Sequence, residues 1–218
     1  MSRLRNIPGS RDRIAESGFC VYEPEKYKGR WDELFGNGRK IHVEIGMGKG
    51  RFIMEQAKRT PEINYIGLEM YSSVLIRAVE KAEEREAEGQ DVSNFRFIRM
   101  NAEELGNVFE KGEISRIYLN FSDPWPKDRH AKRRLTSDRF LELYYGLTDD
   151  GTVIEFKTDN KELFDYSLGT AKESKWKLIS YTYDLYSDPG MLEGNVATEY
   201  EEKFTAKGNR ICKMILEK

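Results

Sequence analysis

The segment FSDPWPKDRHAKRR, residues 121–134, brings one carboxylate and a dense run of cations into a single short stretch of chain. Asp123 and Trp125 each precede a proline, and this restriction favours extended backbone at both residues. Pro124 and Pro126 fix their own φ angles and donate no hydrogen bond. Such a stiff segment can hold the Asp123 carboxylate in a fixed place, and the alternative is a structural aspartate in a turn.

A glycine-rich segment, VEIGMGKG at 43–50, is the second candidate for chemistry. Its glycines, Gly46, Gly48 and Gly50, permit a tight turn and close approach of the backbone to a ligand. The spacing does not match the dinucleotide fingerprint, because residue 51 is arginine, and it does not match a phosphate-binding P-loop. The glycines alone are therefore a weak indication of a nucleotide site.

Two carboxylates make the glycine segment more informative. Glu44 stands two residues before Gly46, where a negative charge repels a pyrophosphate and suits a cationic ligand. Glu69 follows Gly46 by 23 residues, close to the offset of about 20 at which an acid contacts ribose hydroxyls. The pattern describes a nucleoside with a positively charged tail, and S-adenosylmethionine is such a molecule. Asn101 follows the third predicted strand as a candidate contact for adenine, or as a helix N-cap, and the two roles are compatible.

The elements that must position these residues alternate along the chain. Strands are predicted at 40–45, 64–69, 95–99, 115–120 and 151–157, with helices at 50–60, 74–89, 102–109, 137–148 and 161–174. The last two strands, 176–186 and 210–217, are predicted with no helix between them. This order predicts an α/β fold: one Rossmann-like domain at 39–218, with a mostly parallel seven-stranded sheet, helices on both faces and a C-terminal antiparallel hairpin. Residues 1–38 form a basic lead-in outside the sheet.

The composition limits the class of protein. The 218 residues are 39% hydrophobic and 34% charged, as expected for one ordered domain, and no apolar run is long enough to span a membrane. The N-terminus lacks a secretory signal, and Cys20 and Cys212 form no metal motif, so we expect a cytoplasmic protein with free thiols and no metal. Residues 1–13 carry a net charge of +3 and residues 127–134 of +4, so the remainder carries −9. Two basic patches on an acidic body suit a polyanionic partner.

The sequence resembles the tRNA (guanine-N7-)-methyltransferase family, within the seven-stranded, class I S-adenosylmethionine-dependent methyltransferases. The resemblance is carried, in chain order between residues 43 and 204, by VEIGMGKGRF, NYIGLEM, RMNAEEL, LNFSDPWPKDRHAKRRL, EFKTDN and TEYEEKF. The block around SDPWPK is the most specific of these motifs and the glycine turn is the least specific. The resemblance covers nearly the whole predicted domain.

The resemblance implies a role for each candidate residue. Asp123 is expected to be the active-site residue and also to contact the cofactor, S-adenosylmethionine. The other expected cofactor-binding residues are Glu44, Gly46, Gly48, Gly50, Glu69 and Asn101. The expected substrate-binding residues are Lys127, Asp159, Thr198, Glu199, Tyr200 and Glu201. The expected RNA-binding residues are Arg129, Lys132, Arg133 and Arg134.

Some of these residues have structural alternatives. Asp159 fits an N-cap for the helix that follows it. Thr198 and Glu201 form a T-x-x-E pattern that is also a capping box, but the residues after it are predicted to be a strand. Trp125 either flanks the target base or packs beneath its loop, and packing is favoured.

The expected reaction is methylation of guanine N7 in tRNA, and the resemblance places the target in the variable loop, at tRNA position 46. Guanine N7 has a lone pair and no proton, so the reaction needs no general base. The expected partner is tRNA, with no membrane and no metal, and the protein is a monomer or a homodimer. Two alternatives are an enzyme that methylates a small molecule or a protein, and a non-catalytic RNA-binding protein on the same scaffold.

Overall fold

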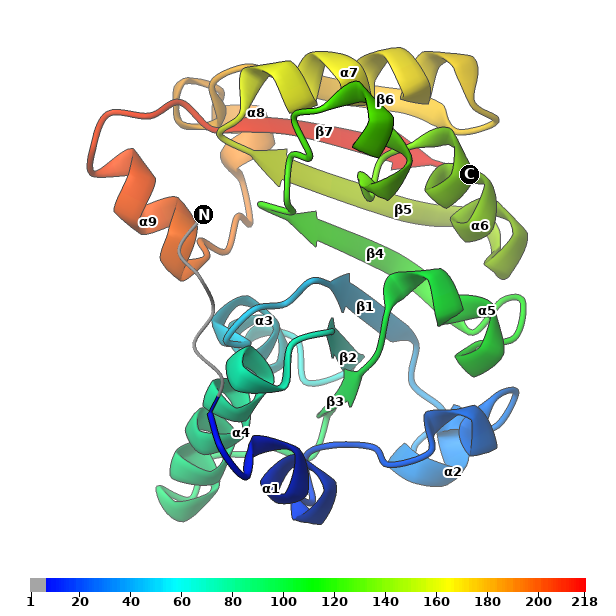
Figure 1. The fold of residues 1–218 in the computed structure, drawn as a ribbon, viewed down its shortest axis with the longest axis vertical. Helices are drawn as coiled ribbons and strands as arrows, with labels where there is room; N and C mark the ends of the chain where they lie inside the picture. The colour runs from blue at the N-terminus through cyan, green and yellow to red at the C-terminus, as the bar shows by residue number, and fades with distance from the viewer. Residues whose placement is uncertain (1–6) are drawn as a thin grey trace. The chain divides into compact units, whose positions relative to one another are not determined.

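The structure is a computed structural model that describes residues 7–218, as two compact units at 7–110 and 111–218 (Figure 1). Arg3 and Arg5 of the N-terminal basic patch lie outside the described residues. The helices and strands predicted from the sequence before residue 183 are present, with most ends within one to three residues of the prediction.

The first unit contains a parallel sheet in the order β3-β2-β1, formed by β1 (Ile41–Ile45), β2 (Asn64–Glu69) and β3 (Phe95–Arg99). The chain passes between these strands through α3 (Arg51–Arg59) and α4 (Ser72–Ala87). The short helices η2 (Ala102–Glu104) and α5 (Leu105–Val108) follow β3. All six residues of β2 are buried, as expected for a central parallel strand covered on both faces.

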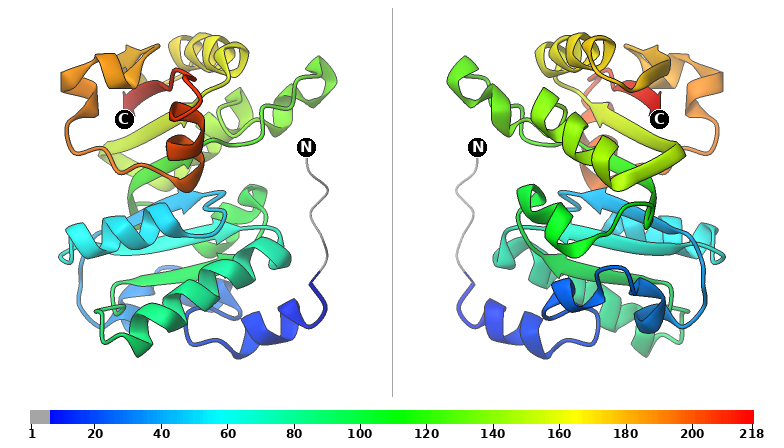
Figure 2. Two further views of the ribbon diagram at one scale, coloured as in Figure 1. Left: turned by 90° about the vertical axis from the view of Figure 1, so that its left-hand side faces the viewer. Right: turned by 90° about the vertical axis from the view of Figure 1, so that its right-hand side faces the viewer.

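The described part of the lead-in packs on this first unit. It forms α1 (Ser10–Glu16), η1 (Pro24–Tyr27) and α2 (Trp31–Phe35). Helix α1 lies against α4 (Figure 2), where Arg13 forms ion pairs with Glu80 and Glu83. The buried Trp31 indole donates a hydrogen bond to the carbonyl of Val108. These contacts give residues 7–38 a place in the fold that periodicity could not predict.

The second unit contains β4 (Ile114–Asn120), β5 (Thr148–Thr158), β6 (Lys177–Thr182) and β7 (Cys212–Glu217). Strands β4 and β5 are parallel, and β7 pairs antiparallel with both β5 and β6. The helices η3 (Asp128–Arg133), α6 (Asp138–Leu147) and α7 (Lys161–Glu173) complete the unit up to β6. The expected α/β class, with parallel strands and an antiparallel C-terminal pair, is confirmed.

The connection between the last two strands differs from the prediction. The expected hairpin without a helix is wrong, because η4 (Leu185–Ser187), α8 (Pro189–Leu192) and α9 (Glu199–Thr205) lie between β6 and β7. The predicted strand after the T-x-x-E pattern is also wrong, since these residues form α9. Helix α9 lies beyond the carboxyl ends of β4 and β5 (Figures 1 and 2). The long connection therefore delivers a helix to the edge of the sheet where a ligand is expected.

Both thiols are free, as expected, and burial raises the pKa of Cys20 to about 12 and that of Cys212 to about 11. No helix within residues 7–218 is long and apolar enough to cross a membrane. The same residues contain no group of three or more His, Cys, Asp or Glu side chains placed to hold a metal ion.

Candidate active site

The glycine turn after β1 requires glycine for its backbone conformation. Gly46, Gly48 and Gly50 have φ angles of 76°, 59° and 73°, a left-handed region that other residues adopt at a cost. The amides of Gly46 and Met47 both donate to the carbonyl of Leu68, and this holds the turn against the end of β2. A Cβ atom on Gly50 would lie only 2.9 Å from the Cβ of Ala78 in α4. Gly50 is therefore also required by the close approach of α4.

Glu69 lies at the end of β2 and is directly connected to this turn. Its Oε2 accepts a hydrogen bond from the amide of Gly48 at 3.2 Å, and its Oε1 accepts one from the amide of Tyr71 at 2.9 Å. The carboxylate is largely buried. The end of β2 and the glycine turn are thus in direct contact through Glu69.

Glu44 and Asn101 lie at the same edge of the three-stranded sheet, because the strands are parallel and in register. Glu44 is buried near the end of β1. Asn101 is exposed and caps η2, accepting a hydrogen bond from the amide of Glu103. The N-cap alternative for Asn101 is confirmed, and the exposed side chain leaves the ligand role compatible with it.

The Asp123 segment follows β4 in the second unit and has unusual backbone geometry. The extended backbone expected at Trp125 is wrong: Phe121 and Trp125 have φ angles of 51° and 42°, which are uncommon for residues other than glycine. Asp123, between them, is exposed. Strained backbone of this kind persists only where the surrounding contacts enforce it. The segment is therefore held by its neighbours as well as by its prolines.

Arg134 is one of these neighbours, and its position differs from that of the other cations in the run. It is only 9% exposed, and its guanidinium donates to the carbonyls of Pro124 and Trp125, both at 3.1 Å. It also lies over the ring of Tyr166 at 4.2 Å from the centroid. Arg134 thus differs from the other cations of the run in being buried, and its hydrogen bonds hold the proline segment.

The remaining cations of the run, Lys127, Arg129, Lys132 and Arg133, are exposed on or beside η3. The guanidinium of Arg133 lies 4.9 Å from the ring of Trp125, which is half-buried and also contacts His130. Trp125 therefore packs within its own loop, as favoured from the sequence.

Asp159 follows β5, at the same end of the sheet as the Asp123 segment, since Asn120 and Lys157 are paired in register. The N-cap of α7 is Asn160, whose side chain accepts from the amide of Leu163, so the capping alternative for Asp159 is wrong. Asp159 instead accepts a hydrogen bond from the side chain of Asn209.

The T-x-x-E segment forms a complete capping box at the start of α9. The Thr198 hydroxyl accepts from the amide of Glu201, and the Glu201 carboxylate accepts from the amide of Thr198. Acidic residues in the first turn also interact favourably with the helix dipole. Glu199 is half-buried, while Tyr200 is 43% exposed beside the ring of Phe121.

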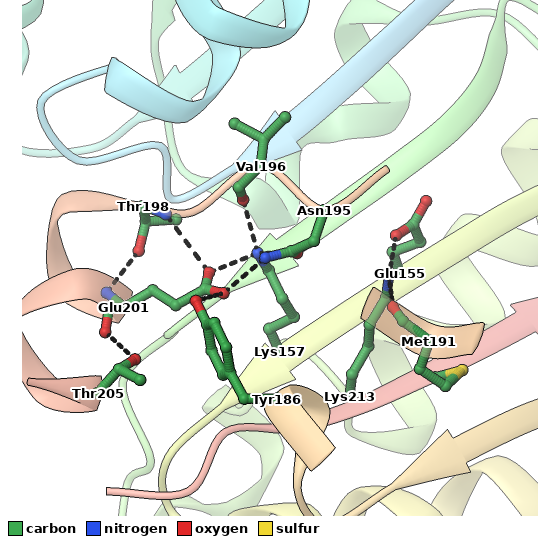
Figure 3. Close-up of polar contacts among 10 residues, drawn as sticks. All are labelled: Glu155, Lys157, Tyr186, Met191, Asn195, Val196, Thr198, Glu201, Thr205 and Lys213. Atoms are coloured by element: carbon green, nitrogen blue, oxygen red, sulfur yellow. Dashed lines mark hydrogen bonds and ion pairs between the residues drawn. The ribbon is translucent and has the colours of Figure 1, made fainter. Parts of the chain in front are cut away.

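Glu201 is fully buried, and its partner is a residue that the sequence analysis missed. The ammonium of Lys157 lies 2.6 Å from Oε2 of Glu201, and it also donates to Asn195 and to the carbonyl of Val196 (Figure 3). Burial lowers the pKa of Lys157, and the Glu201 carboxylate opposes that shift. The only sequence signal was a lysine at the end of the predicted strand 151–157, directly after Phe156, and in the structure the last three residues of β5 are all buried.

Comparison with known proteins adds sequence evidence to this geometry. The model of a family described as "Putative methyltransferase" matches residues 38–214. The tRNA (guanine-N(7)-)-methyltransferase of Lachnoclostridium phytofermentans is 54% identical, covering 98% of this chain and 97% of that protein. The protein of the same name from a Geobacillus species is 53% identical, covering 96% of this chain and 92% of that protein.

Solved structures share the fold at much lower identity. A 16S rRNA methyltransferase, KamB, has a TM-score of 0.65 at 13% identity, covering 87% of this chain and 92% of that chain. A mutant 16S rRNA (adenine(1408)-N(1))-methyltransferase from Catenulisporales acidiphilia, solved with its cosubstrate SAM, has a TM-score of 0.59 at 13% identity, covering 90% and 92%. The Rossmann-like methyltransferase fold is thereby confirmed.

Proposed function

Because the chain belongs to the tRNA (guanine-N(7)-)-methyltransferase family, we propose that it transfers a methyl group from S-adenosylmethionine to N7 of a guanine in tRNA. The observation that carries this proposal is identity above 50% to relatives of that name over nearly the whole chain. The target within tRNA is the guanine of the variable loop, as the resemblance implies. We also propose a cytoplasmic location, as a monomer or a homodimer.

The residues at the edge of the first unit fit such a cofactor. Three glycines with left-handed φ angles follow β1, and the carboxylates of Glu44, near the end of β1, and Glu69, at the end of β2, lie at the same edge of the sheet. Carboxylates suit the ribose hydroxyls and the cationic groups of S-adenosylmethionine better than they suit a phosphate. In this proposal Glu69 accepts from the ribose, Glu44 favours the methionine end, and Asn101 contacts the adenine.

Glu69→Ala is expected to weaken binding of S-adenosylmethionine by about 10- to 150-fold, because losing a charged acceptor costs about 1.5–3 kcal/mol. Isothermal titration calorimetry measures the effect, with circular dichroism to show that the variant is folded. Glu62→Ala, which removes an exposed acid from the same unit, is the control and should bind like the wild type. Unchanged affinity in a folded Glu69→Ala protein would exclude the ribose role.

Methylation of guanine N7 requires no general base, because N7 carries no proton. When bound, S-adenosylmethionine would supply an electrophilic methyl group, whose bond to the positively charged sulfur breaks as the lone pair of guanine N7 bonds to the methyl carbon, leaving a neutral thioether. The protein must align N7 with the methyl carbon and accommodate the positive charge that passes to the base. Asp123 is proposed to accept hydrogen bonds from the guanine edge and to offset this charge. Asp123 also lies near the cofactor in this proposal.

The remaining polar residues are proposed to hold the tRNA. Lys127, Asp159 and the segment Thr198, Glu199, Tyr200 and Glu201 are proposed to bind the substrate around the target base. Because Glu201 is buried, its part in substrate binding is to hold the segment that carries Tyr200. The exposed cations Arg129, Lys132 and Arg133 are proposed to contact phosphates, which position the RNA without reading its sequence. A target base stacked inside folded RNA must be exposed or turned out for reaction, as enzymes that act on bases generally require.

Arg129→Gln/Lys132→Gln is expected to weaken tRNA binding and to flatten its salt dependence. Each lost phosphate contact lowers the slope of log K against log salt by roughly 0.7–0.9, so the pair should lower it by about 1.4–1.8. Binding titrations at several salt concentrations measure the slope, and affinity for S-adenosylmethionine should not change. Lys172→Gln/Lys177→Gln, which removes two exposed lysines elsewhere in the second unit, is the control. A slope equal to that of the control would identify the η3 cations as solvated surface.

A methyl-transfer assay on total tRNA, followed by mapping of the modified base, tests the function directly. Formation of N7-methylguanine in the variable loop is the expected result. Methylation of a small molecule or a protein, with none in tRNA, would support the first alternative. Binding of tRNA without binding of the cofactor would support a non-catalytic RNA-binding protein.

A further inference from the structure

The buried ion pair of Lys157 and Glu201 connects the end of β5 to α9. The two side chains are 4% and 0% exposed, and Lys157 also binds Asn195 and Val196 just before α9 (Figure 3). The other Glu201 oxygen accepts from Tyr186 and Asn195, at 3.1 and 2.8 Å. A buried pair of this kind is weak evidence for stability, because the loss of hydration offsets the attraction. Stability alone therefore does not account for the pair.

The backbone of Lys157 reaches the Asp123 segment. Its carbonyl accepts a hydrogen bond from the amide of Phe121 at 2.8 Å. Phe121 has the left-handed φ angle of 51°, an unfavourable conformation that only surrounding contacts can maintain. Asp123 follows Phe121 by two residues and Asp159 follows Lys157 by two residues. Lys157 is therefore bound through its backbone to the residue two positions before Asp123, and it lies two positions before Asp159 in the chain.

The side chains complete the connection. The ring of Phe121 lies 4.9 Å from the ring of Tyr200, which precedes Glu201 in α9 and stacks on Phe204 at 4.0 Å. Phe121 also packs against a buried apolar cluster, formed by Leu185, Met191 and Ile211. These contacts begin and end at Lys157. The Lys157 backbone binds Phe121, the Phe121 ring contacts Tyr200, and the residue after Tyr200 binds the Lys157 side chain.

We propose that Lys157 and Glu201 are positioning residues for methyl transfer, which clamp α9 against Phe121 and thereby set the place of Asp123. This inference rests on the proposed function of the Asp123 segment. The pair touches neither substrate nor cofactor in this proposal. It acts through the strained backbone of Phe121 and through Tyr200, so a small displacement of α9 misplaces the catalytic carboxylate.

The test uses a variant that removes the clamp without leaving one buried charge alone. Lys157→Met/Glu201→Leu replaces the pair with apolar side chains, a change that proteins tolerate far better than loss of one partner. A misplacement of about 1 Å can cost 100-fold in rate, so we expect single-turnover methyl transfer to tRNA to slow by about 10- to 100-fold. The dissociation constant for S-adenosylmethionine should stay within about threefold of the wild-type value, because its proposed contacts are in the first unit. The transfer rate is measured at saturating tRNA, so that a weaker contact of tRNA with the segment that carries Tyr200 does not contribute.

Lys213→Met is the matched control. Lys213 is equally buried, lies on β7, and pairs with Glu155 and the carbonyl of Met191 in α8 rather than with α9 (Figure 3). Each protein is assayed well below its own melting temperature. A wild-type single-turnover rate in the folded double variant, or an equal loss of rate in Lys213→Met, would overturn the proposal, because either result makes the pair merely structural.

Tyr200 supplies a second test if the double variant does not fold, since its partly exposed side chain can be changed with little risk. Tyr200→Ala removes the ring contact with Phe121 and should slow single-turnover transfer at least about tenfold. Tyr200→Phe keeps the ring and should recover most of that loss. An unaffected rate in Tyr200→Ala, or no recovery in Tyr200→Phe, would contradict an action through the ring.

The outcome for the clamp can be separated from that for the proposed function. If the wild-type protein methylates a different atom or a different RNA, the proposed function fails. The ratio of variant to wild-type rates on that other acceptor still tests the clamp. If N7-methylguanine forms in tRNA but the variants keep the wild-type rate, only the clamp fails.

Discussion

Asp123→Asn is expected to lower the single-turnover rate of methyl transfer by about 100- to 1000-fold, as removal of one preorganised group that stabilises transition-state charge does. Asparagine keeps one acceptor oxygen, but it lacks the negative charge and presents donors toward the donors of guanine. Asp123→Ala removes both the acceptor and the charge and should be at least as slow. Since the exposed cations of η3 are unchanged, the affinity for tRNA should fall far less than the rate.

The measurement uses saturating cofactor and tRNA, so that a binding defect does not contribute. Asp128→Asn is the matched control, because Asp128 is an exposed acid in the same loop and should keep nearly the wild-type rate. A near wild-type rate for Asp123→Asn would refute the role of the charge. The same result for Asp123→Ala would remove Asp123 from the mechanism.

Glu201→Leu is expected to lower the free energy of unfolding by about 3–5 kcal/mol, because it leaves the ammonium of Lys157 buried beside α9 without its carboxylate. This is a large part of the stability of a typical protein, about 5–15 kcal/mol. Lys157→Met should also lower the free energy of unfolding, because it leaves the carboxylate of Glu201 buried without its ammonium partner. The double variant Lys157→Met/Glu201→Leu should lose less than the sum of the single changes, with a coupling of about 2–3 kcal/mol.

Urea denaturation of the wild type, the two single variants and the double variant measures this coupling as a double-mutant cycle. Glu202→Leu is the matched control, since it makes the same substitution at an exposed neighbour in α9 and should stay within about 0.5 kcal/mol of the wild type. Additive losses in the cycle would show that the two charges do not depend on each other. A loss in Glu202→Leu as large as in Glu201→Leu would assign the effect to the helix rather than to the ion pair.

Elements with strong periodicity and clear boundaries were predictable from the sequence. Strand β2 is bounded as predicted, at Asn64–Glu69, because a run of apolar residues lies between Pro61 and the polar start of α4. The glycine turn was predictable for a similar reason, since few residues other than glycine accept a left-handed φ angle. The structure adds a direct contact of Glu69 with Gly48, which is possible because β1 and β2 are parallel neighbours that end at one edge.

The region after β6 was not predictable in this way. The T-x-x-E pattern indicated a capping box, but the helix it starts has only seven residues, too short for periodicity to outweigh the aromatic residues around it. A helix of this length is marginal on its own in water and is stabilised by tertiary contacts. For α9 these contacts are the Lys157 ion pair and the ring of Phe121.

The sequence by itself determined the alternation of strands and helices, the glycine turn, and the presence of Asp123 in a stiff segment before a basic run. These features depend on residues close together in the chain, where backbone restriction and periodicity act directly. Only the tertiary structure decided which charges face water and which are enclosed. Arg134 lies in the same run as Arg133, yet it is buried against the carbonyls of Pro124 and Trp125. Lys157 and Glu201 are 44 residues apart and become an ion pair only when α9 docks on the end of β5. Burial of a charge is a property of the packed chain, because it depends on whether a distant segment brings the opposite charge to the same place.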